Sequence, residues 1–284
     1  MNYRHAFHAG NFADVLKHAV LMAVLQYLTK KTQPLRVIDT HAGIGLYDLE
    51  GEQAQRTQEW RLGIGRLIAA EFSPAARQGL LPYLDSVTEV RKIYGPSAYP
   101  GSPLLAQSCL RPEDRMVLNE KHPDDRILLE QAIGRDRRIK ILGQDGYMAL
   151  NALVPPAERR GLVLIDPPFE DKREFTLLLQ GFARGYGKWP TGTYLLWYPL
   201  KNKILTDHFE AELQKMALPR LLRLELAVRS WQEAGSLYGS GLMIVNPPFV
   251  LAAQMRALLP ELDAVLAQES GHFWRCDWLG RAAE

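Results

Sequence analysis

The residues with the clearest chemical meaning follow an apolar run near the middle of the chain. Asp166-Pro167-Pro168-Phe169 comes directly after Gly161-Leu-Val-Leu-Ile165, and such a run is typical of a buried parallel strand. Because prolines cannot continue a strand ladder, they predict a stiff turn that holds Asp166 at the carboxyl edge of the sheet, where open α/β folds bind ligands. An acceptor, a rigid turn and an aromatic ring together suit a reaction on the exocyclic amine of a nucleobase.

Further polar residues follow the neighbouring strand candidates. The run over 35–39 leads into Thr40-His41-Ala42-Gly43-Ile44-Gly45, whose glycines would let the backbone approach a ligand closely. Glu120 ends a strand predicted over 116–120, in the place of an acid that accepts hydrogen bonds from ribose hydroxyls. Asp145 follows a further strand, where it could accept a hydrogen bond from an adenine amino group or only cap the next helix.

The order of these residues predicts more than any one of them does. A glycine loop, a strand-end acid, a turn aspartate and Asp-Pro-Pro-aromatic on successive strand ends is the layout of an S-adenosylmethionine-dependent amino methyltransferase. A dinucleotide oxidoreductase would instead carry Gly-x-Gly-x-x-Gly against its first strand, with an acid ~20 residues further on. Here the third glycine is absent and 81 residues separate Asp39 from Glu120, which disfavours that class.

The motif at Asp166 also predicts how the reaction would proceed. The exocyclic amine of adenine is a poor nucleophile because its lone pair is delocalised into the ring. The Asp166 carboxylate and the Pro167 carbonyl would accept hydrogen bonds from its two N–H groups and aim the nitrogen at the methyl group, and the carboxylate would take up the proton as charge develops. Phe169 would stack on the unstacked base, a contact worth ~1–3 kcal/mol.

Asn246-Pro247-Pro248-Phe249 is a second candidate for the same role, because it also follows an apolar run, over 241–245. We prefer Asp166 because it comes 21 residues after Asp145, which leaves room for one helix and one strand between them. Asn246 lies three strand candidates further along, where such a fold usually has an antiparallel edge pair. Catalysis by Asn246 therefore stays an alternative.

The elements that must position these residues alternate between strands and helices. The first helix is predicted over 12–31, with Asn11 as its N-cap and Asp14 at the capping-box position. Strands alternating with helices imply right-handed βαβ units, and so an α/β fold with a mostly parallel, Rossmann-like sheet and helices on both faces. The other strands are predicted over 139–142, 161–165, 193–198, 222–228 and 241–245, and the other helices from Ser102, over 123–134 and up to Leu153.

Residues 46–98 differ from the rest, because 58–71 and 74–94 have helical spacing and no strand signal separates them. We therefore expect one methyltransferase domain, made of residues 1–45 and 99–284, that is interrupted by a helical insertion over 46–98. Just after the insertion, Ser102 is predicted to be a helix cap, because Pro103 suits the first helical position.

The composition is that of an ordinary soluble protein, with 47% hydrophobic and 23% charged residues among 284 and a net charge of +2. Residues 1–36 carry five cations against Asp14 alone, a net charge of +4, which fits either a solvated helix end or a phosphate-contacting face. The two cysteines are far apart in the sequence and lack the spacing of metal ligands, so no metal is expected. Without a secretion signal or a bilayer-length apolar stretch, we expect a cytoplasmic protein with no membrane partner.

Several segments together resemble the ribosomal RNA large subunit methyltransferase J family. The similarity runs from Tyr3 through the Asn246-Pro-Pro segment, and the amino-terminal segment and the Thr-His-Ala-Gly loop are its more specific parts. The resemblance implies N6-methylation of one adenine in 23S ribosomal RNA, with S-adenosylmethionine as the methyl donor, on a Rossmann-like fold with a small helical insertion. The segments that carry it are His8-Ala-Gly-Asn11, Ala13-Asp-Val-Leu-Lys-His18, Asp39-Thr-His-Ala-Gly43, Tyr99-Pro-Gly-Ser-Pro103 and Asp166-Pro-Pro.

The resemblance also implies roles for single residues. Asp166 matches the family's catalytic acceptor, and Tyr3 matches a residue that touches the RNA substrate. Phe169 departs from the family's motif, which often ends in tyrosine, so the stacking ring is kept and the hydroxyl is lost. The expected cofactor contacts are Lys17, His18, His41, Gly43, Ser102, Glu120, Asp145, Gly146 and Asp166.

Other interpretations stay open. Without the resemblance, His18 would be taken as a core histidine and Lys17 as a solvated helix charge. A DNA adenine-N6 methyltransferase is the alternative enzyme, although only residues 46–98 could serve as its target-recognition domain. A non-catalytic RNA-binding protein of the same fold is the third possibility. The protein is expected to be a monomer, and the cations considered as phosphate contacts are Arg159, Arg160, Lys201 and Lys203.

Overall fold

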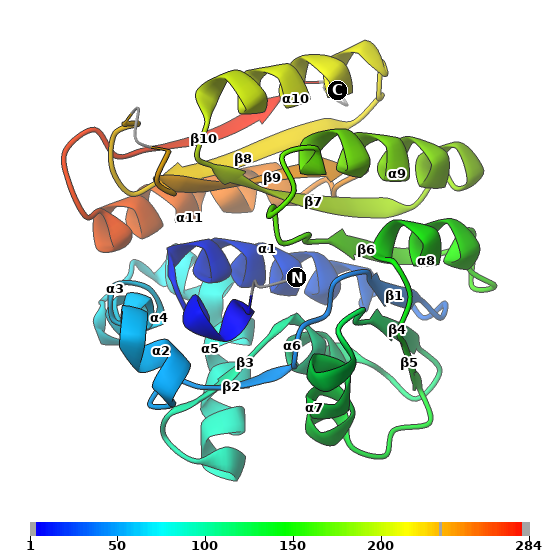
Figure 1. The fold of residues 1–284 in the computed structure, drawn as a ribbon, viewed down its shortest axis with the longest axis horizontal. Coiled ribbons are helices and arrows are strands. Elements are labelled where there is room, and N and C mark those ends of the chain that lie inside the picture. The colour runs from blue at the N-terminus through cyan, green and yellow to red at the C-terminus, as the bar shows by residue number, and fades with distance from the viewer. Residues whose placement is uncertain (1–3, 233–234, 280–284) are drawn as a thin grey trace.

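The computed structural model of this chain describes residues 4–232 and 235–279. Its main strands are β1 (Arg36–Asp39), β4 (Arg115–Asn119), β5 (Ile139–Leu142), β6 (Gly161–Ile165), β7 (Thr193–Leu200), β8 (Leu221–Ala227), β9 (Gly239–Val245) and β10 (Phe273–Trp278). They form one eight-stranded sheet in the order β10-β8-β9-β7-β6-β1-β4-β5 (Figure 1). The strands predicted from the sequence are confirmed to within two residues at each end, and β10 is a strand that the sequence analysis does not predict.

The strand order reverses next to β1. This strand pairs in parallel with β4 on one side and with β6 on the other, and β5 and β7 extend the parallel part of the sheet. β9 is antiparallel to β7 and to β8, and β10 is antiparallel to β8. The carboxyl ends of β1 and β6 therefore lie side by side at the switch point, which is where open α/β sheets bind ligands.

Strand β6 shows why the central strands are apolar throughout. Leu162 and Leu164 belong to one buried cluster, whereas Val163 and Ile165 belong to another, because successive side chains of a strand point to opposite faces. Helices cover both faces, as predicted (Figure 1). The first cluster includes residues of α1 (Phe12–Leu28), α6 (Ser102–Cys109), α7 (Pro123–Ile133) and α11 (Leu251–Leu266), and the second includes residues of α8 (Gly146–Leu153), α9 (Glu174–Lys188) and α10 (Lys203–Lys215).

The segment between β1 and α6 is helical, with a short antiparallel ribbon at its base. Strand β2 (Leu46–Asp48) pairs with β3 (Ala98–Pro100), and between them lie α2 (Glu52–Thr57), α3 (Glu59–Leu62), α4 (Ile64–Ala69) and α5 (Pro74–Tyr94). The ribbon is not predicted from the sequence, whereas α5 is. The boundaries of the insertion at 46 and 98 stay a prediction.

One predicted helix in this segment, over 58–71, is divided in two at Gly63. A Cβ atom on Gly63 would lie 2.1 Å from the carbonyl oxygen of Gly10, so the break lets the backbone pass close to the start of α1. The prediction of a single continuous helix was therefore wrong, because a long-range contact with Gly10 divides the helix.

Helix α1 begins as predicted but ends at Leu28, not Lys31. Asn11 is its N-cap, because its side chain accepts hydrogen bonds from the backbone N–H groups of Ala13 and Asp14. Only half of the predicted capping box forms, because the Asp14 carboxylate accepts a hydrogen bond from the Gly10 N–H at 2.9 Å and the Asn11 N–H donates to the His8 carbonyl oxygen. The Asp14 carboxylate also pairs with His5 and Lys17 inside the protein.

Within residues 4–232 and 235–279, no helix has both the length and the apolar character needed to cross a bilayer.

Candidate functional site

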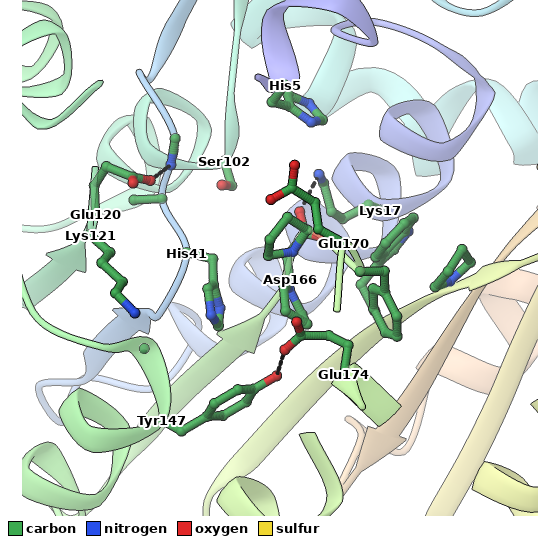
Figure 2. Close-up of a pocket in the computed structure, with 18 of the residues that line it drawn as sticks. His5, Lys17, His41, Ser102, Glu120, Lys121, Tyr147, Asp166, Glu170 and Glu174 are labelled. Atoms are coloured by element: carbon green, nitrogen blue, oxygen red, sulfur yellow. Dashed lines mark hydrogen bonds and ion pairs between the residues drawn. The ribbon is translucent and has the colours of Figure 1, made fainter. Parts of the chain in front are cut away.

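A cavity of about 1420 Å³ opens at the carboxyl ends of the parallel strands. It is larger than the roughly 300–1,000 Å³ of an ordinary small-molecule site, so it has room for a cofactor and a nucleobase together. Tyr3 lies outside the described residues, and every other residue predicted for the site lines the cavity (Figure 2). These residues are Lys17, His18, His41, Gly43, Ser102, Glu120, Asp145, Gly146, Asp166, Pro167 and Phe169.

Asp166 follows β6, and one of its oxygens is held by a lysine of α1. The Lys17 Nζ lies 2.6 Å from Asp166 Oδ2 and 2.8 Å from Asp14 Oδ1. Although burial opposes the charge on Lys17, the two carboxylates keep its pKa well above the usual value. The alternative of a solvated helix charge is wrong, because only 5% of the Lys17 side chain is exposed.

Asp14 is a member of this cluster that the sequence analysis takes only as a helix cap. It also lies 2.9 Å from His5 Nε2, and His5 belongs to a short 3-10 helix, η1 (His5–Phe7). Although burial opposes ionisation, His5 and Lys17 hold the pKa of Asp14 well below its usual value. A usable signal was present in the sequence, since Asp14, Lys17 and His18 share one face of a mostly apolar helix.

His18 is both a core residue and part of the cavity wall. Its Nδ1 lies 2.8 Å from the Tyr99 hydroxyl, which in turn lies 2.7 Å from the Tyr83 hydroxyl. Burial lowers the pKa of His18 to about 3, so the ring is neutral at neutral pH. The interpretation as a buried core histidine is therefore confirmed, and a contact between His18 and the cofactor stays a prediction.

The loop after β1 is fixed by Asp39. Its Oδ2 accepts a hydrogen bond from the Ser102 hydroxyl at 2.7 Å, and its Oδ1 accepts one from the His41 backbone N–H at 3.2 Å. The prediction that Ser102 caps α6 is wrong, because Gly101 is the N-cap and the Ser102 hydroxyl points to Asp39. Burial, with repulsion from Asp166, raises the pKa of Asp39 to about 6 against these hydrogen bonds.

Glu120 connects this loop to the end of β4. Its Oε2 accepts a hydrogen bond from the Gly43 N–H at 2.9 Å, and its Oε1 accepts one from the His122 N–H at 2.8 Å. Gly43 has φ +63°, and a Cβ there would lie 2.5 Å from the Tyr47 hydroxyl, so glycine is needed for the turn. Burial raises the pKa of Glu120.

Asp145 caps the helix that follows it and also lines the cavity. Its Oδ1 accepts hydrogen bonds from the backbone N–H groups of Tyr147 and Met148, and its Oδ2 lies 3.3 Å from Lys121 Nζ. A Cβ on the next residue, Gly146, would lie 2.4 Å from His41 Nε2. Burial lowers the pKa of His41 to about 4, so a neutral imidazole packs closely against the backbone of Gly146.

Tyr147 and Glu174 form a further part of the wall that the sequence analysis does not predict. The Tyr147 hydroxyl donates a hydrogen bond to Glu174 Oε1 at 2.7 Å (Figure 2). Burial raises the pKa of Glu174. No motif marks this pair, because its members are 27 positions apart on two different helices.

Phe169 ends the turn after β6 in a left-handed conformation, with φ +51°. Its ring packs edge-on against the rings of Phe175, at 4.8 Å, and Trp197, at 5.7 Å. These neighbours fix the plane of a ring that is half-buried on the cavity wall.

Asn246 is placed at the opposite edge of the sheet, because β9 is antiparallel to β7 and Val245 pairs with Tyr194 near the start of that strand. Its Nδ2 donates hydrogen bonds to the carbonyl oxygens of Pro190 and Gly192, both at 2.8 Å. Asn246 does not line the cavity. This motif therefore closes a structural turn away from Asp166.

The four cations considered as phosphate contacts do not all lie at the cavity. Lys201 lines the cavity, whereas the other three do not. Arg160 donates hydrogen bonds to the carbonyl oxygens of Leu28 and Gln33, and Lys203 pairs with Asp207 at 2.6 Å. Within the ranges that the structure covers, no group of three or more His, Cys, Asp or Glu side chains is arranged to hold a metal ion, and the absence of a metal from the reaction stays a prediction.

Comparison with known proteins gives a consistent result along the chain. The family model described as "Ribosomal RNA large subunit methyltransferase D, RlmJ" matches residues 32–280. A protein of Haemophilus influenzae named ribosomal RNA large subunit methyltransferase J is 37% identical over 282 residues, which are 98% of this chain and 99% of that protein. Its namesake from Escherichia coli is 38% identical over 273 residues, 96% of each chain. A crystal structure of a Legionella pneumophila protein has a TM-score of 0.85 and 33% identity, and covers 95% of this chain and 98% of that one.

Proposed function

This chain belongs to the ribosomal RNA large subunit methyltransferase J family, and on that premise we propose that it methylates N6 of an adenine in 23S ribosomal RNA, with S-adenosylmethionine as the methyl donor. The coarser part of the proposal, methylation of ribosomal RNA, rests on the names of the relatives. The finer part, the reacting atom and the cofactor, rests on the chemistry of the cavity.

The observation that carries the proposal is the asymmetric environment of Asp166. Its Oδ2 is held by Lys17 at 2.6 Å, whereas its Oδ1 has no hydrogen-bond partner within residues 4–232 and 235–279. The side chain lines the cavity directly after a buried strand. A carboxylate with one oxygen anchored and the other facing a cavity is suited to accept a hydrogen bond from an amine in a fixed direction.

The residues around the cavity fit S-adenosylmethionine. Glu120 would accept hydrogen bonds from the ribose hydroxyls and Asp145 one from the adenine amino group, while Gly146 lets the backbone lie against the His41 ring in the cavity wall. The low pKa values of His18 and His41 keep both rings neutral, so they add no repulsion against a cationic cofactor. Bound there, the cofactor would supply an electrophilic methyl group.

Asp166 and the turn after it would then position the target base. Asp166 Oδ1 and the Pro167 carbonyl would accept the two N–H hydrogen bonds of the adenine amine, and Phe169 would stack on the ring. When nitrogen forms its bond to the methyl carbon and the carbon–sulfur bond breaks, the amine becomes acidic, and Asp166 would accept the proton that leaves.

A substrate panel tests this proposal. Purified protein is incubated with isotopically labelled S-adenosylmethionine and, separately, with unmodified 23S ribosomal RNA, 16S ribosomal RNA and duplex DNA. The proposal expects label in N6-methyladenine from 23S RNA only. Label in DNA alone would favour the DNA adenine methyltransferase, and RNA binding with no label in any substrate would favour the non-catalytic protein.

A further inference from the structure

The cations that line the cavity fall into two groups according to their partners. Lys17 pairs with Asp14 and Asp166, and Lys121 pairs with Asp145. Three other cavity-lining cations, Arg184, Lys188 and Lys201, make no ion pair within the part of the chain that the structure describes. These three side chains therefore keep their charge available for an anion from outside the protein.

Two of the three cations lie on one helix and form one edge of a groove. Arg184 and Lys188 are both exposed on α9 and lie four positions apart, which places them on the same face, one turn from each other. Helix α8 runs beside α9 on the same side of the sheet (Figure 1). The Lys188 Nζ donates a hydrogen bond to the Asn151 carbonyl oxygen of α8 at 2.6 Å, so its side chain reaches across the space between the two helices.

The two helices can lie this close because of glycines on their buried side. A Cβ on Gly181 would lie 2.4 Å from the Tyr147 ring, and one on Gly185 would lie 3.1 Å from Leu150. The exposed side of the same helix pair forms a groove that is continuous with the cavity at Asp166, and its floor includes the exposed Met148, 69% accessible, and Ala152.

The charge along this groove changes with distance from Asp166. Near Asp166 the cavity is lined by three further acids, Glu170, Asp171 and Glu174. The Glu174 carboxylate is buried and accepts a hydrogen bond from Tyr147, and Asp171 pairs with Arg173 at 2.7 Å. Further along α8 and α9, the only charged residues that line the cavity are Arg184 and Lys188. A groove with an apolar floor and two cations on one edge that make no ion pair matches a ribose–phosphate chain, which carries one negative charge per nucleotide, better than it matches a neutral or basic peptide.

We propose that the groove between α8 and α9 binds the sugar–phosphate backbone of the RNA segment next to the methylated adenine, with Arg184 and Lys188 contacting phosphates. This inference rests on the proposed function, because it assigns a path to the RNA whose adenine enters the cavity at Asp166. Contacts of this kind set the position of the strand and depend on salt, and they carry no base specificity of their own.

The test compares two double variants that each remove two exposed positive charges. Arg184→Gln/Lys188→Gln alters the groove. Lys30→Gln/Lys31→Gln alters the segment between α1 and β1, at the opposite edge of the sheet, where both lysines are exposed and do not line the cavity. Each protein is assayed for binding of a 23S RNA fragment across a salt series, for kcat and KM with that RNA, and for S-adenosylmethionine affinity.

For the groove variant we expect a roughly tenfold rise in KM for RNA and a salt slope of binding shallower by about 1.4, about 0.7 for each lost phosphate contact on a single strand. Its kcat at saturating RNA and its cofactor affinity should match those of the wild type. An unchanged slope and KM in the groove variant, or a loss confined to the Lys30/Lys31 variant, would overturn the proposal. A wild-type protein that methylates no RNA would instead refute the proposed function, and the binding measurements would still decide whether RNA occupies the groove.

Discussion

The Lys17 Nζ lies 2.6 Å from Asp166 Oδ2, a contact between residues 149 positions apart in the chain. It joins the first helix to the end of the strand that carries the proposed acceptor carboxylate. Because Lys17 also contacts Asp14 at 2.8 Å, one buried ammonium group is shared by two carboxylates. The position of Asp166 therefore depends on the packing of the amino-terminal helix as well as on its own turn.

Replacement of this lysine should destabilise the protein strongly. Lys17→Met leaves two carboxylates without their cation in a buried site, and breaking such a pair typically costs about 3–5 kcal/mol of unfolding free energy. Lys92→Met is a matched control, because Lys92 also pairs with an acid three positions before it, Glu89, but on the surface, where such pairs contribute little. Urea denaturation of both variants measures the difference. Equal stability of Lys17→Met and the wild type would show that the buried pair is not needed.

Two glycine substitutions should have opposite effects. A Cβ on Gly146 would lie 2.4 Å from His41 Nε2 and 2.8 Å from the Thr40 carbonyl oxygen, so Gly146→Ala should displace the loop after β1. We expect a loss of about 1–3 kcal/mol in stability and weaker binding of S-adenosylmethionine. Gly187→Ala, in open space on α9, should instead raise stability by up to about 1 kcal/mol. Thermal denaturation measures the stability of both variants, and titration measures their affinity for S-adenosylmethionine. Normal cofactor affinity in Gly146→Ala would show that the contact between Gly146 and His41 does not shape the cofactor site.

Asp39 should make the stability of the protein depend on pH. Burial raises its pKa to about 6 in the folded chain, whereas the unfolded value is about 3.9. The folded state therefore holds the proton longer, and the unfolding free energy contributed by this group falls as pH rises from about 4 to about 6, by about 3 kcal/mol in all. Asp39→Asn removes the titration, so the stability difference between wild type and variant should change over that window. A stability difference between wild type and Asp39→Asn that does not change with pH would show that folding does not raise the pKa of Asp39.

The ring of Phe169 should matter for RNA more than for the cofactor. Phe169→Ala removes the proposed stacking surface, worth about 1–3 kcal/mol, so KM for RNA should rise while S-adenosylmethionine affinity changes little. Phe169→Tyr keeps a ring between Phe175 and Trp197 and should keep most of the activity. Steady-state kinetics with each substrate varied in turn separates the two effects. A defect of cofactor affinity alone would exclude the stacking role.

Local patterns in the sequence were sufficient to predict the strand-end residues of the site. The apolar run before Asp166 and the runs before Asp39 and Glu120 each end in a polar residue, and parallel strands bring such ends to one edge. The same patterns failed for β10 (Phe273–Trp278), because it is an edge strand in which only Cys276 is buried. Strands β2 and β3 were missed because each has only three residues.

Contacts between distant residues could not be predicted in this way. The bond from Ser102 to Asp39 joins residues 63 positions apart, and local sequence favoured a helix cap for Ser102 instead. Asp14 was taken as part of a capping box for the same reason, although its partners are Lys17, His5 and the Gly10 N–H. For Ser102, a tertiary contact replaced the local hydrogen bond that the sequence pattern suggested. For Asp14, the competing partners are themselves local, within nine positions in the chain.

The most direct test of the proposed chemistry compares the two Pro-Pro motifs in one assay. Wild type, Asp166→Ala and Asn246→Ala are incubated with labelled S-adenosylmethionine and 23S RNA, and the nucleosides are separated after digestion, with folding and cofactor binding checked for each protein. We expect labelled N6-methyladenine from wild type and from folded Asn246→Ala, whose side chain only closes a turn, and almost none from Asp166→Ala. Wild-type rates in Asp166→Ala, together with an inactive but folded Asn246→Ala, would contradict the assignment of Asp166 as the acceptor.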